Sequence, residues 1–200
     1  MQDSKKGFVP FRVEKSLSSS QHPKTSVEIE RMRGIPYASA VGSLMYTMMC
    51  TRPDICFVVG MVSRYQSEPS EENWIAVKHI LKYLRRTRDY MLVYQSESLE
   101  PIGYTDSDLQ SDIDFIKSTS RYVFTFGGGA ISWRSVKQSS IANSTMEAEY
   151  IAASEPATEA LWLKNFLMDL EVVPFERSAI TLYSDNSGAI ANSKEPRNHK

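Results

Sequence analysis

The sequence predicts an α/β fold for its C-terminal half, a mixed sheet with flanking helices, preceded by a small helical segment. Two observations carry this prediction. From about residue 90 the hydrophobic residues change from helical spacing to short alternating runs, and these runs alternate with helical stretches in the order strand, hairpin, helix, strand, helix. The chain has 200 residues, of which 42% are hydrophobic and 24% charged, enough for one ordinary core with a helical appendage.

The helical segment is expected over residues 36–90. Two apolar runs, 37–50 and 54–65, flank the sequence "TRPD", in which Pro53 suits the first turn of the second helix. Ser70 is a candidate N-cap for a third helix, in which apolar residues recur at helical spacing.

The beginning of the chain and its composition exclude several classes of protein. Residues 1–35 are polar and interrupted by prolines and a serine run, so we expect a linker or an extended arm. Two cysteines without a CxxC pair argue against a disulfide framework or a zinc site and favour a reducing, intracellular setting. No window approaches the roughly 18 to 20 apolar residues that span a bilayer, so no membrane partner is expected. With a formal net charge of −1, a polyanion would be held by a local basic face or through metal ions.

Residues 91–200 carry the signals of the α/β unit. Three successive glycines allow the positive φ values of a tight turn, and hydroxyls followed by acids at residues 144–149 are typical of a helix start. The predicted elements are strands at 91–95 and 101–106, a hairpin within 121–133, a helix from 144 towards 170, a strand ending at 185 and a final helix.

Three acids occupy comparable places in this pattern: Asp106 and Asp185 end predicted strands, and Glu149 lies in the first turns of the helix. Carboxylates that meet at one sheet edge repel one another, so such a cluster persists when cations neutralise it. Oxygen ligands select hard ions such as Mg²⁺, and two ions about 4 Å apart promote hydrolysis of a phosphodiester. A lone strand-end Asp is more often a turn residue or helix cap, and the residue pattern leaves both interpretations open.

Several longer stretches resemble a known family. "YTDSD", "STMEAEYIAAS" and "LYSDNSGAI" are similar to the ribonuclease H domain of the Pol polyproteins of copia-type LTR retrotransposons. "TRPDICFVVGMVSRYQ" and "WIAVKHILKYLRRTRDYMLVY" are similar to the segment that follows the reverse transcriptase palm in the same polyproteins. The resemblance covers nearly the whole chain. It implies a truncated ribonuclease H-like domain over residues 91–200 and a thumb- or connection-like helical remnant over residues 36–90.

The resemblance also implies a function. The family domain cuts the RNA strand of an RNA:DNA hybrid with two Mg²⁺ or Mn²⁺ ions, with Asp106 as the bridging carboxylate and Asp185 and Glu149 as further ligands. Glu149 is preferred to Glu147 because "AEYIAA" matches the family's catalytic Glu and its apolar helical run. Asp108 is then a neighbouring loop acid. The implied partners are the hybrid and the remainder of the polyprotein, and the implied location is a cytoplasmic virus-like particle.

Other residues are candidates for contacts with nucleic acid. Ser144 and Asn186 are candidates for the minor groove of a hybrid, although both also suit helix caps. Trp133 and Trp162 lie in apolar patterns, which favours core packing over base stacking. One helix carries a basic group that suits either a phosphate backbone or a solvated face: Lys78, Lys82, Arg85 and Arg86.

The sequence also departs from the family. No counterpart of the family's fourth metal-site acid follows "KEPRNHK", and no Y-x-D-D polymerase motif is found, so the chain looks cut at both ends. Arg121 stands where a glycine is common, and Pro156 falls inside the long helix, at a cost of about 3 kcal/mol unless a kink absorbs it. Three hypotheses remain: a metal-dependent hybrid ribonuclease; an inactive, degenerate fragment that retains at most nucleic-acid binding; or a fragment that does not fold stably by itself.

Overall fold

The computed structural model describes residues 7–11, 17–95, 99–171 and 179–195. It divides into two compact units, the helical unit (Met1–Leu92) and the sheet unit (Val93–Lys200), and each is described by itself. Parts of the N-terminal arm, residues 1–6 and 12–16, and the final residues of "KEPRNHK", 196–200, lie outside the described residues.

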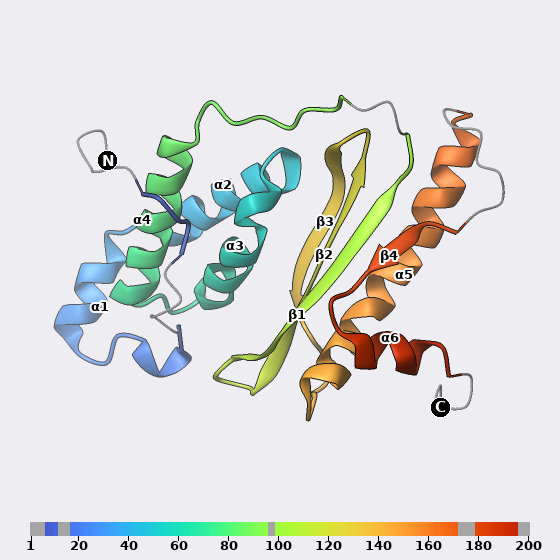
Figure 1. Cartoon of the computed structure of the whole chain (residues 1–200). Helices are drawn as coiled ribbons and strands as arrows, with labels where there is room; N and C mark the ends of the chain where they lie inside the picture. Colours follow the sequence, from blue (N-terminus) through green and yellow to red (C-terminus); the bar gives the residue numbers. More distant parts are fainter. Residues whose placement is uncertain (1–6, 12–16, 96–98, 172–178, 196–200) are drawn as a thin grey trace. The chain divides into compact units, whose positions relative to one another are not determined.

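The described residues of the helical unit form four α-helices and three single 3-10 turns, one before the first helix, one between the second and third and one between the third and fourth. Figure 1 shows these helices. The helix expected over residues 37–50 is found with those bounds, whereas the run over 54–65 forms a short α-helix between two 3-10 turns. The elements are η1 (Ser19–Gln21), α1 (Ser26–Arg33), α2 (Tyr37–Cys50), η2 (Pro53–Ile55), α3 (Cys56–Val62), η3 (Ser63–Tyr65) and α4 (Glu71–Arg86).

Local capping explains where these helices start. Ser70 caps α4 as predicted, because its Oγ accepts the Asn73 N–H at 3.1 Å while Asn73 Oδ1 accepts the Ser70 N–H at 2.8 Å. Thr25 and Glu28 form the same kind of reciprocal cap on α1. Helix α1 lies in the segment expected to be linker or arm, so that expectation was incomplete: its capping pair and buried Met32 outweigh the neighbouring proline and glycine.

The core of the helical unit forms where α2, α3 and α4 meet. Val41, Val59, Val77 and Ile80 are fully buried there, and the hydroxyl of Tyr37 donates a hydrogen bond to the carbonyl of Val62 at 2.8 Å. This burial supplies the hydrophobic stabilisation that the helices would lack in isolation.

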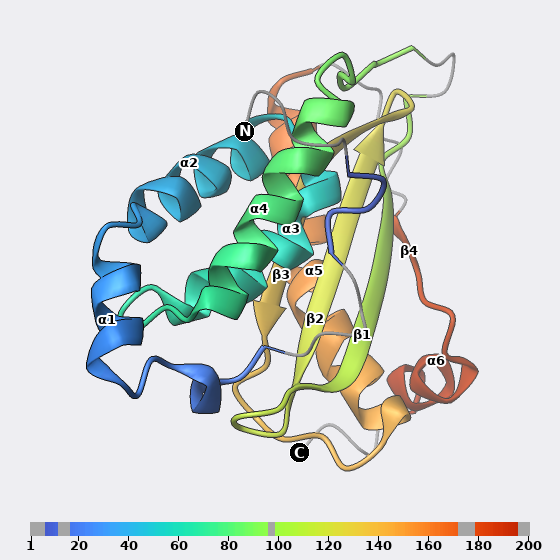
Figure 2. The same ribbon diagram turned by 90° about the vertical axis from the view of Figure 1, so that its left-hand side faces the viewer.

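The sheet unit has a four-stranded mixed sheet in the order β3-β2-β1-β4. Neighbours β1/β2 and β2/β3 run antiparallel, and β1/β4 run parallel, which confirms the predicted α/β class with a ribonuclease H-like mixed sheet. Figures 1 and 2 show α5 along one face of the sheet, with α6 following β4. The elements are β1 (Ile102–Asp112), β2 (Lys117–Phe126), β3 (Gly129–Lys137), α5 (Thr145–Asp169), β4 (Thr181–Tyr183) and α6 (Ser187–Ser193).

The predicted hairpin is confirmed, whereas two strand predictions need correction. Gly127 and Gly128 have φ values of 57° and 82° and join β2 to β3 in a two-residue turn. Residues 91–95 form no strand; instead the Tyr94 ring lies against Gly129, and its hydroxyl donates to the Ala130 carbonyl at 2.8 Å. Strand β1 continues to Asp112, past the positive φ of Gln110, because β2 pairs with it up to Asp108 and, after an irregularity, again at Asp112.

Pro156 lies in the interior of α5 and is fully buried. A proline has no N–H, so the carbonyl of Ala152, four residues earlier, loses its helical donor. The hydroxyl of Thr105 on β1 donates to this carbonyl at 3.2 Å and thereby replaces the missing bond. The departure at Pro156 is therefore compensated by a contact that ties α5 to β1.

The outer end of α5 differs from the expected core packing. The side chain of Trp162 is 54% exposed and stacks on Phe166 with ring centroids 5.1 Å apart, so its assignment to the core was wrong. Its helical neighbours Leu163 and Leu167 take the buried positions instead. Within the described residues, no helix combines the length and apolar character needed to cross a bilayer.

Candidate metal centre

Strand β1 directs alternate side chains to opposite faces of the sheet. Thr105 and Ser107 turn towards α5, where they contact Ala152 and Glu149 respectively. Asp106 therefore points to the opposite face, the side on which its cross-strand partner Arg121 also lies. The alternation puts a carboxylate between two residues that anchor the helix.

The parallel pairing of β1 with β4 brings Asp106 and Asp185 together. Tyr104 and Tyr183 are register partners, and their rings stack with centroids 5.5 Å apart. Each aspartate follows its tyrosine by two residues, so the pairing places the two aspartates at the same level along the sheet. Strand β4 ends at Tyr183, which leaves Asp185 at the open edge just beyond the strand.

Glu149 reaches this edge from the second turn of α5 and is only 6% exposed. The Ser107 N–H and hydroxyl both donate to its Oε1, at 2.9 and 3.0 Å. Its Oε2 is buried and accepts no hydrogen bond from the described residues. Burial raises the pKa of Glu149, and the charges of Asp106 and Asp185 raise it further, against the lowering effect of the Ser107 bonds.

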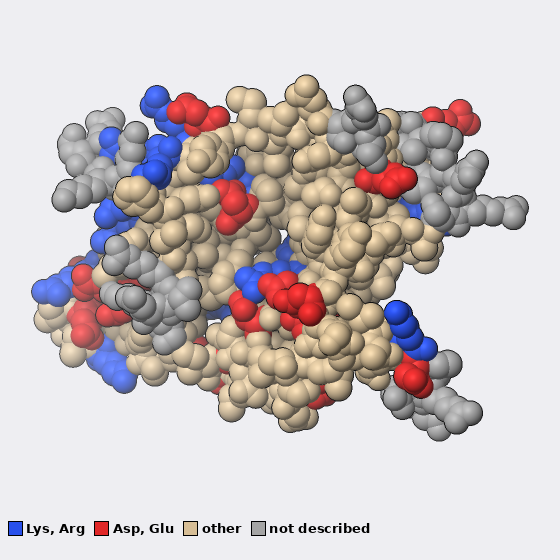
Figure 3. All heavy atoms as spheres, viewed as in Figure 1, with Lys and Arg blue, Asp and Glu red and all other residues tan. Residues whose placement is uncertain are grey.

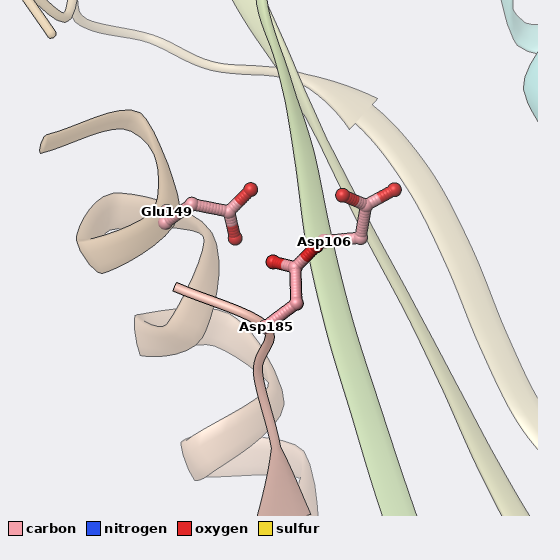
Figure 4. Close-up of side chains that lie close together, drawn as sticks. All are labelled: Asp106, Glu149 and Asp185. Atoms are coloured by element: carbon pink, nitrogen blue, oxygen red, sulfur yellow. The ribbon is translucent and has the colours of Figure 1, made fainter. Parts of the chain in front are cut away.

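The three acids form one cluster, in which one carboxylate oxygen from each lies within 4.8 Å of the others. Figure 4 shows the Glu149 side chain extending from α5 towards Asp185, with Asp106 on the neighbouring strand β1. Acidic side chains gather at the surface over β1 (Figure 3). The geometry brings together all three carboxylates that the sequence singled out, in a spacing compatible with shared cation ligation.

Two nearby acids have other contacts. Glu147 Oε2 accepts the Asn143 N–H at 2.9 Å, and its own N–H donates to the Ser144 hydroxyl at 3.1 Å, so Glu147 belongs to the cap of α5. Asp108 is a strand residue that pairs with Thr119, rather than the loop acid expected, because β1 continues beyond it.

Arg121 is the basic group that contacts the cluster. Its Nη2 lies 2.7 Å from Oδ2 of Asp106 and 2.9 Å from Oδ1 of Asp108. The contact follows from the register, because Arg121 on β2 is the direct antiparallel partner of Asp106 on β1.

The candidate nucleic-acid contacts are divided between the units. Ser144 and Asn186 both act as helix caps, with Asn186 Oδ1 accepting the Ala189 N–H at 2.9 Å. The guanidinium of Arg86 lies 3.8 Å from the centre of the Phe8 ring, so the arm covers part of the basic side of α4. Two further candidates, Lys78 and Lys82, are half-buried, and Arg85 is exposed.

Sequence reasoning missed the side chains that position the cluster. Ser107 holds Glu149, and Thr105 holds the helix that carries it. The only available signal was their place on either side of Asp106, since a strand sends flanking residues to the face opposite the central one. Arg121 was noted as a departure from the family, but its partner carboxylates are visible only in the paired strands.

The mixed sheet, the long helix against it and the acids on β1, on α5 and just beyond β4 define a ribonuclease H-like fold with an acidic cluster. No family model and no solved structure matches the chain. Curated proteins do match it. The retrovirus-related Pol polyprotein from transposon TNT 1-94 of Nicotiana tabacum is 46% identical over 199 residues, which cover 100% of this chain and 15% of the polyprotein.

Two further relatives are similar over shorter stretches. The retrovirus-related Pol polyprotein from transposon RE1 of Arabidopsis thaliana is 35% identical over 154 residues, covering 76% of this chain and 10% of the polyprotein. The secreted RxLR effector protein 161 of Plasmopara viticola is 44% identical over 133 residues, covering 66% of this chain and 94% of that protein. The chain belongs to the retrovirus-related Pol polyproteins of transposons, of the copia type.

Proposed function

We propose that the sheet unit hydrolyses the RNA strand of RNA:DNA hybrids with the aid of divalent cations. The observation that carries the proposal is the convergence of Asp106, Glu149 and Asp185 within 4.8 Å, together with the buried Oε2 of Glu149, which receives no hydrogen bond from the part of the chain that the structure describes. An unpartnered buried carboxylate oxygen is costly unless a cation completes its coordination.

The residues fit a hard divalent ion. The cluster offers carboxylate oxygens alone, which favours Mg²⁺ or Mn²⁺ over softer metals. Asp106, Glu149 and Asp185 would hold the cation. A bound divalent ion would make a coordinated water a better nucleophile and stabilise negative charge on the phosphodiester.

The surrounding residues position the acids for this role. Ser107 directs both of its hydrogen bonds to one oxygen of Glu149, which leaves the other oxygen for a ligand. The parallel pairing of Tyr104 with Tyr183 holds the two aspartates at one level. A rigid supporting shell of this kind keeps catalytic groups in a productive geometry without reorganisation on binding.

The helical unit would supply contacts to the hybrid backbone. Its resemblance to the segment after the reverse transcriptase palm supports a role as a connection-like unit within the polyprotein. Arg85 is exposed at the end of α4, and Lys78 and Lys82 are half-buried on the same helix. Each neutralised phosphate would steepen the salt dependence of hybrid binding. In an active element, this segment would work in a cytoplasmic particle with the rest of the polyprotein.

The test is cleavage of a labelled RNA:DNA hybrid by the purified chain in Mg²⁺ and in Mn²⁺. We expect metal-dependent cutting that Asp185→Asn reduces by about 10²-fold or more, because the substitution removes a ligand charge. Asp169→Asn is the matched control, since Asp169 is exposed at the end of α5. The proposal would be contradicted if the Asp185→Asn chain cut the hybrid as well as the wild-type chain. It would also be contradicted if the folded wild-type chain did not cut the hybrid in the presence of metal.

A second candidate function is hybrid binding without cleavage. The contact between Arg121 and Asp106 favours it, because a guanidinium engages one oxygen of a central carboxylate. Binding and cleavage separate the two functions: a non-catalytic chain would bind the hybrid equally well before and after Asp185→Asn, and would not cut it in either metal.

A further inference from the structure

One guanidinium nitrogen is shared by two carboxylates at the edge of the acidic cluster. Nη2 of Arg121 lies 2.7 Å from Asp106 Oδ2 and 2.9 Å from Asp108 Oδ1. Asp106 is also one of the three acids whose oxygens lie within 4.8 Å of one another. The same carboxylate therefore serves an internal cation and the candidate metal centre.

The contact restricts what Asp106 has to offer a metal ion. A carboxylate that gives one oxygen to each of two ions needs both oxygens free, and here Oδ2 is in hydrogen-bonding distance of a guanidinium. A divalent ion on that oxygen would meet the positive charge at close range.

The pair has little value as a structural staple. The side chains of Arg121, Asp106 and Asp108 are 30%, 52% and 40% exposed, and pairs this open contribute little to stability because water screens them. Its principal effect is to place positive charge at one side of the acids, where it partly neutralises Asp106 and Asp108.

We propose that Arg121 takes the place of one divalent ion, so that the cluster binds a single ion. This inference rests on the proposed metal centre and concerns its stoichiometry. Glu149, Asp185 and the remaining oxygen of Asp106 hold the ion, and Arg121 occupies the Asp106–Asp108 side. A chain without the guanidinium has room and negative charge for a second ion.

The test is a titration of the full chain with Mn²⁺, in which bound ion is counted by electron paramagnetic resonance and by calorimetry. We expect one ion per wild-type chain and two per Arg121→Gln chain. Arg134→Gln is the matched control, because Arg134 also extends from a strand and pairs with a carboxylate, Glu155, on α5. That variant should bind one ion.

Asp185→Asn in the Arg121→Gln background assigns the ions to the cluster, since it should reduce the count. Arg121→Ala is the second variant, and circular dichroism and hydrogen exchange establish that each variant is folded. Two ions in the wild-type chain, or the same count in wild type and both Arg121 variants, would overturn the role of Arg121 and leave the metal centre standing. No bound ion in any folded chain would overturn the metal centre itself and this inference with it.

Discussion

Asp54 in the helical unit and Glu149 in the sheet unit are two carboxylates whose pKa values move in opposite directions. For Asp54, partial burial raises the pKa, but the hydrogen bonds from Arg52 and Tyr83 and the charge of Arg52 outweigh it, so the pKa is lowered. For Glu149, burial raises the pKa, and the two bonds from Ser107 do not compensate.

The two carboxylates differ in how many of their oxygens receive hydrogen bonds. Arg52 donates to both oxygens of Asp54, at 2.9 and 2.7 Å, and the Tyr83 hydroxyl adds a third bond at 2.8 Å. Glu149 has one oxygen with two donors and one with none among the described residues. A satisfied network stabilises the fold, whereas an incomplete one beside two other acids leaves a position for a cation.

The largest expected effect comes from breaking the satisfied network. Arg52→Met removes the donors to Asp54 and to Thr87, whose hydroxyl receives an Arg52 bond at 2.6 Å. Because the Arg52 side chain is 10% exposed, we expect a loss of about 3 kcal/mol in the stability of the helical unit. Hydrogen exchange of α2 and α4 amides measures it. Arg33→Met is the control, since the exposed Arg33–Glu30 pair contributes little; equal losses in both variants would refute this distinction.

The next largest effect is a loss of stability in the contact between β1 and α5, the helix that carries Glu149. Thr105→Val leaves the Ala152 carbonyl without the donor that replaces the missing Pro156 amide, and we expect a loss of about 1 to 2 kcal/mol in the sheet unit. Hydrogen exchange of α5 and β1 amides measures the loss. Pro156→Ala restores an amide, so the loss from Thr105→Val should be smaller in that background.

Thr158→Val is the matched control for the double-mutant cycle of Thr105→Val and Pro156→Ala. Its hydroxyl donates to the carbonyl of Ser154 on the exposed side of the same helix, at 3.3 Å. We expect no coupling between Thr158→Val and Pro156→Ala. If the Thr105 and Pro156 substitutions were simply additive, the compensation inferred for the Ala152 carbonyl would not exist.

The opposite pKa shifts predict opposite dependences of stability on pH. The pKa of Glu149 is raised above 4.5, so its contribution is present below that pH and is lost as the pH rises through the folded value. The pKa of Asp54 is lowered below 3.8, so its contribution is present above that pH and is lost on acidification.

Urea unfolding from pH 3 to 8, followed by hydrogen exchange for each unit, checks this contrast. Glu149→Gln should remove the decline of the sheet unit above pH 4.5, and Asp54→Asn should remove the acid-side decline of the helical unit. Mg²⁺ should reduce the loss of sheet-unit stability above pH 4.5 in the wild-type chain, because a cation stabilises the ionised acids. A decline that persists unchanged in Glu149→Gln would show that another group causes it.

The smallest expected effect is the change in stability caused by Arg121→Gln, which is compared with that of Arg52→Met. Arg121→Gln should change the stability of the sheet unit by less than about 1 kcal/mol, because its pairs with Asp106 and Asp108 are partly exposed. Urea unfolding of the sheet unit measures it against the loss from Arg52→Met in the helical unit. A change in Arg121→Gln as large as that of Arg52→Met would mean that both networks are structural.

Local patterns predicted many elements because they depend on neighbouring residues. The helix over 37–50, the Ser70 cap and the glycine hairpin all rest on contacts within a few positions, and each is found. Other predictions were wrong because they depend on pairing between residues that are distant in the sequence. Strand β1 extends to Asp112 because β2 lies beside it, and the run at 91–95 has no strand partner. Trp162 is exposed although its pattern is apolar, because only part of the α5 circumference faces the sheet.

The sequence by itself determined the family, the order of elements in the sheet unit and the identity of Asp106, Glu149 and Asp185 as candidate ligands. These depend on residue type and on spacing along the chain. Only the tertiary structure decided how the acids are held, with Ser107 on one oxygen of Glu149 and Arg121 on one oxygen of Asp106. The physical reason is that strand register and helix docking bring together residues distant in sequence, and spacing alone does not specify such partners.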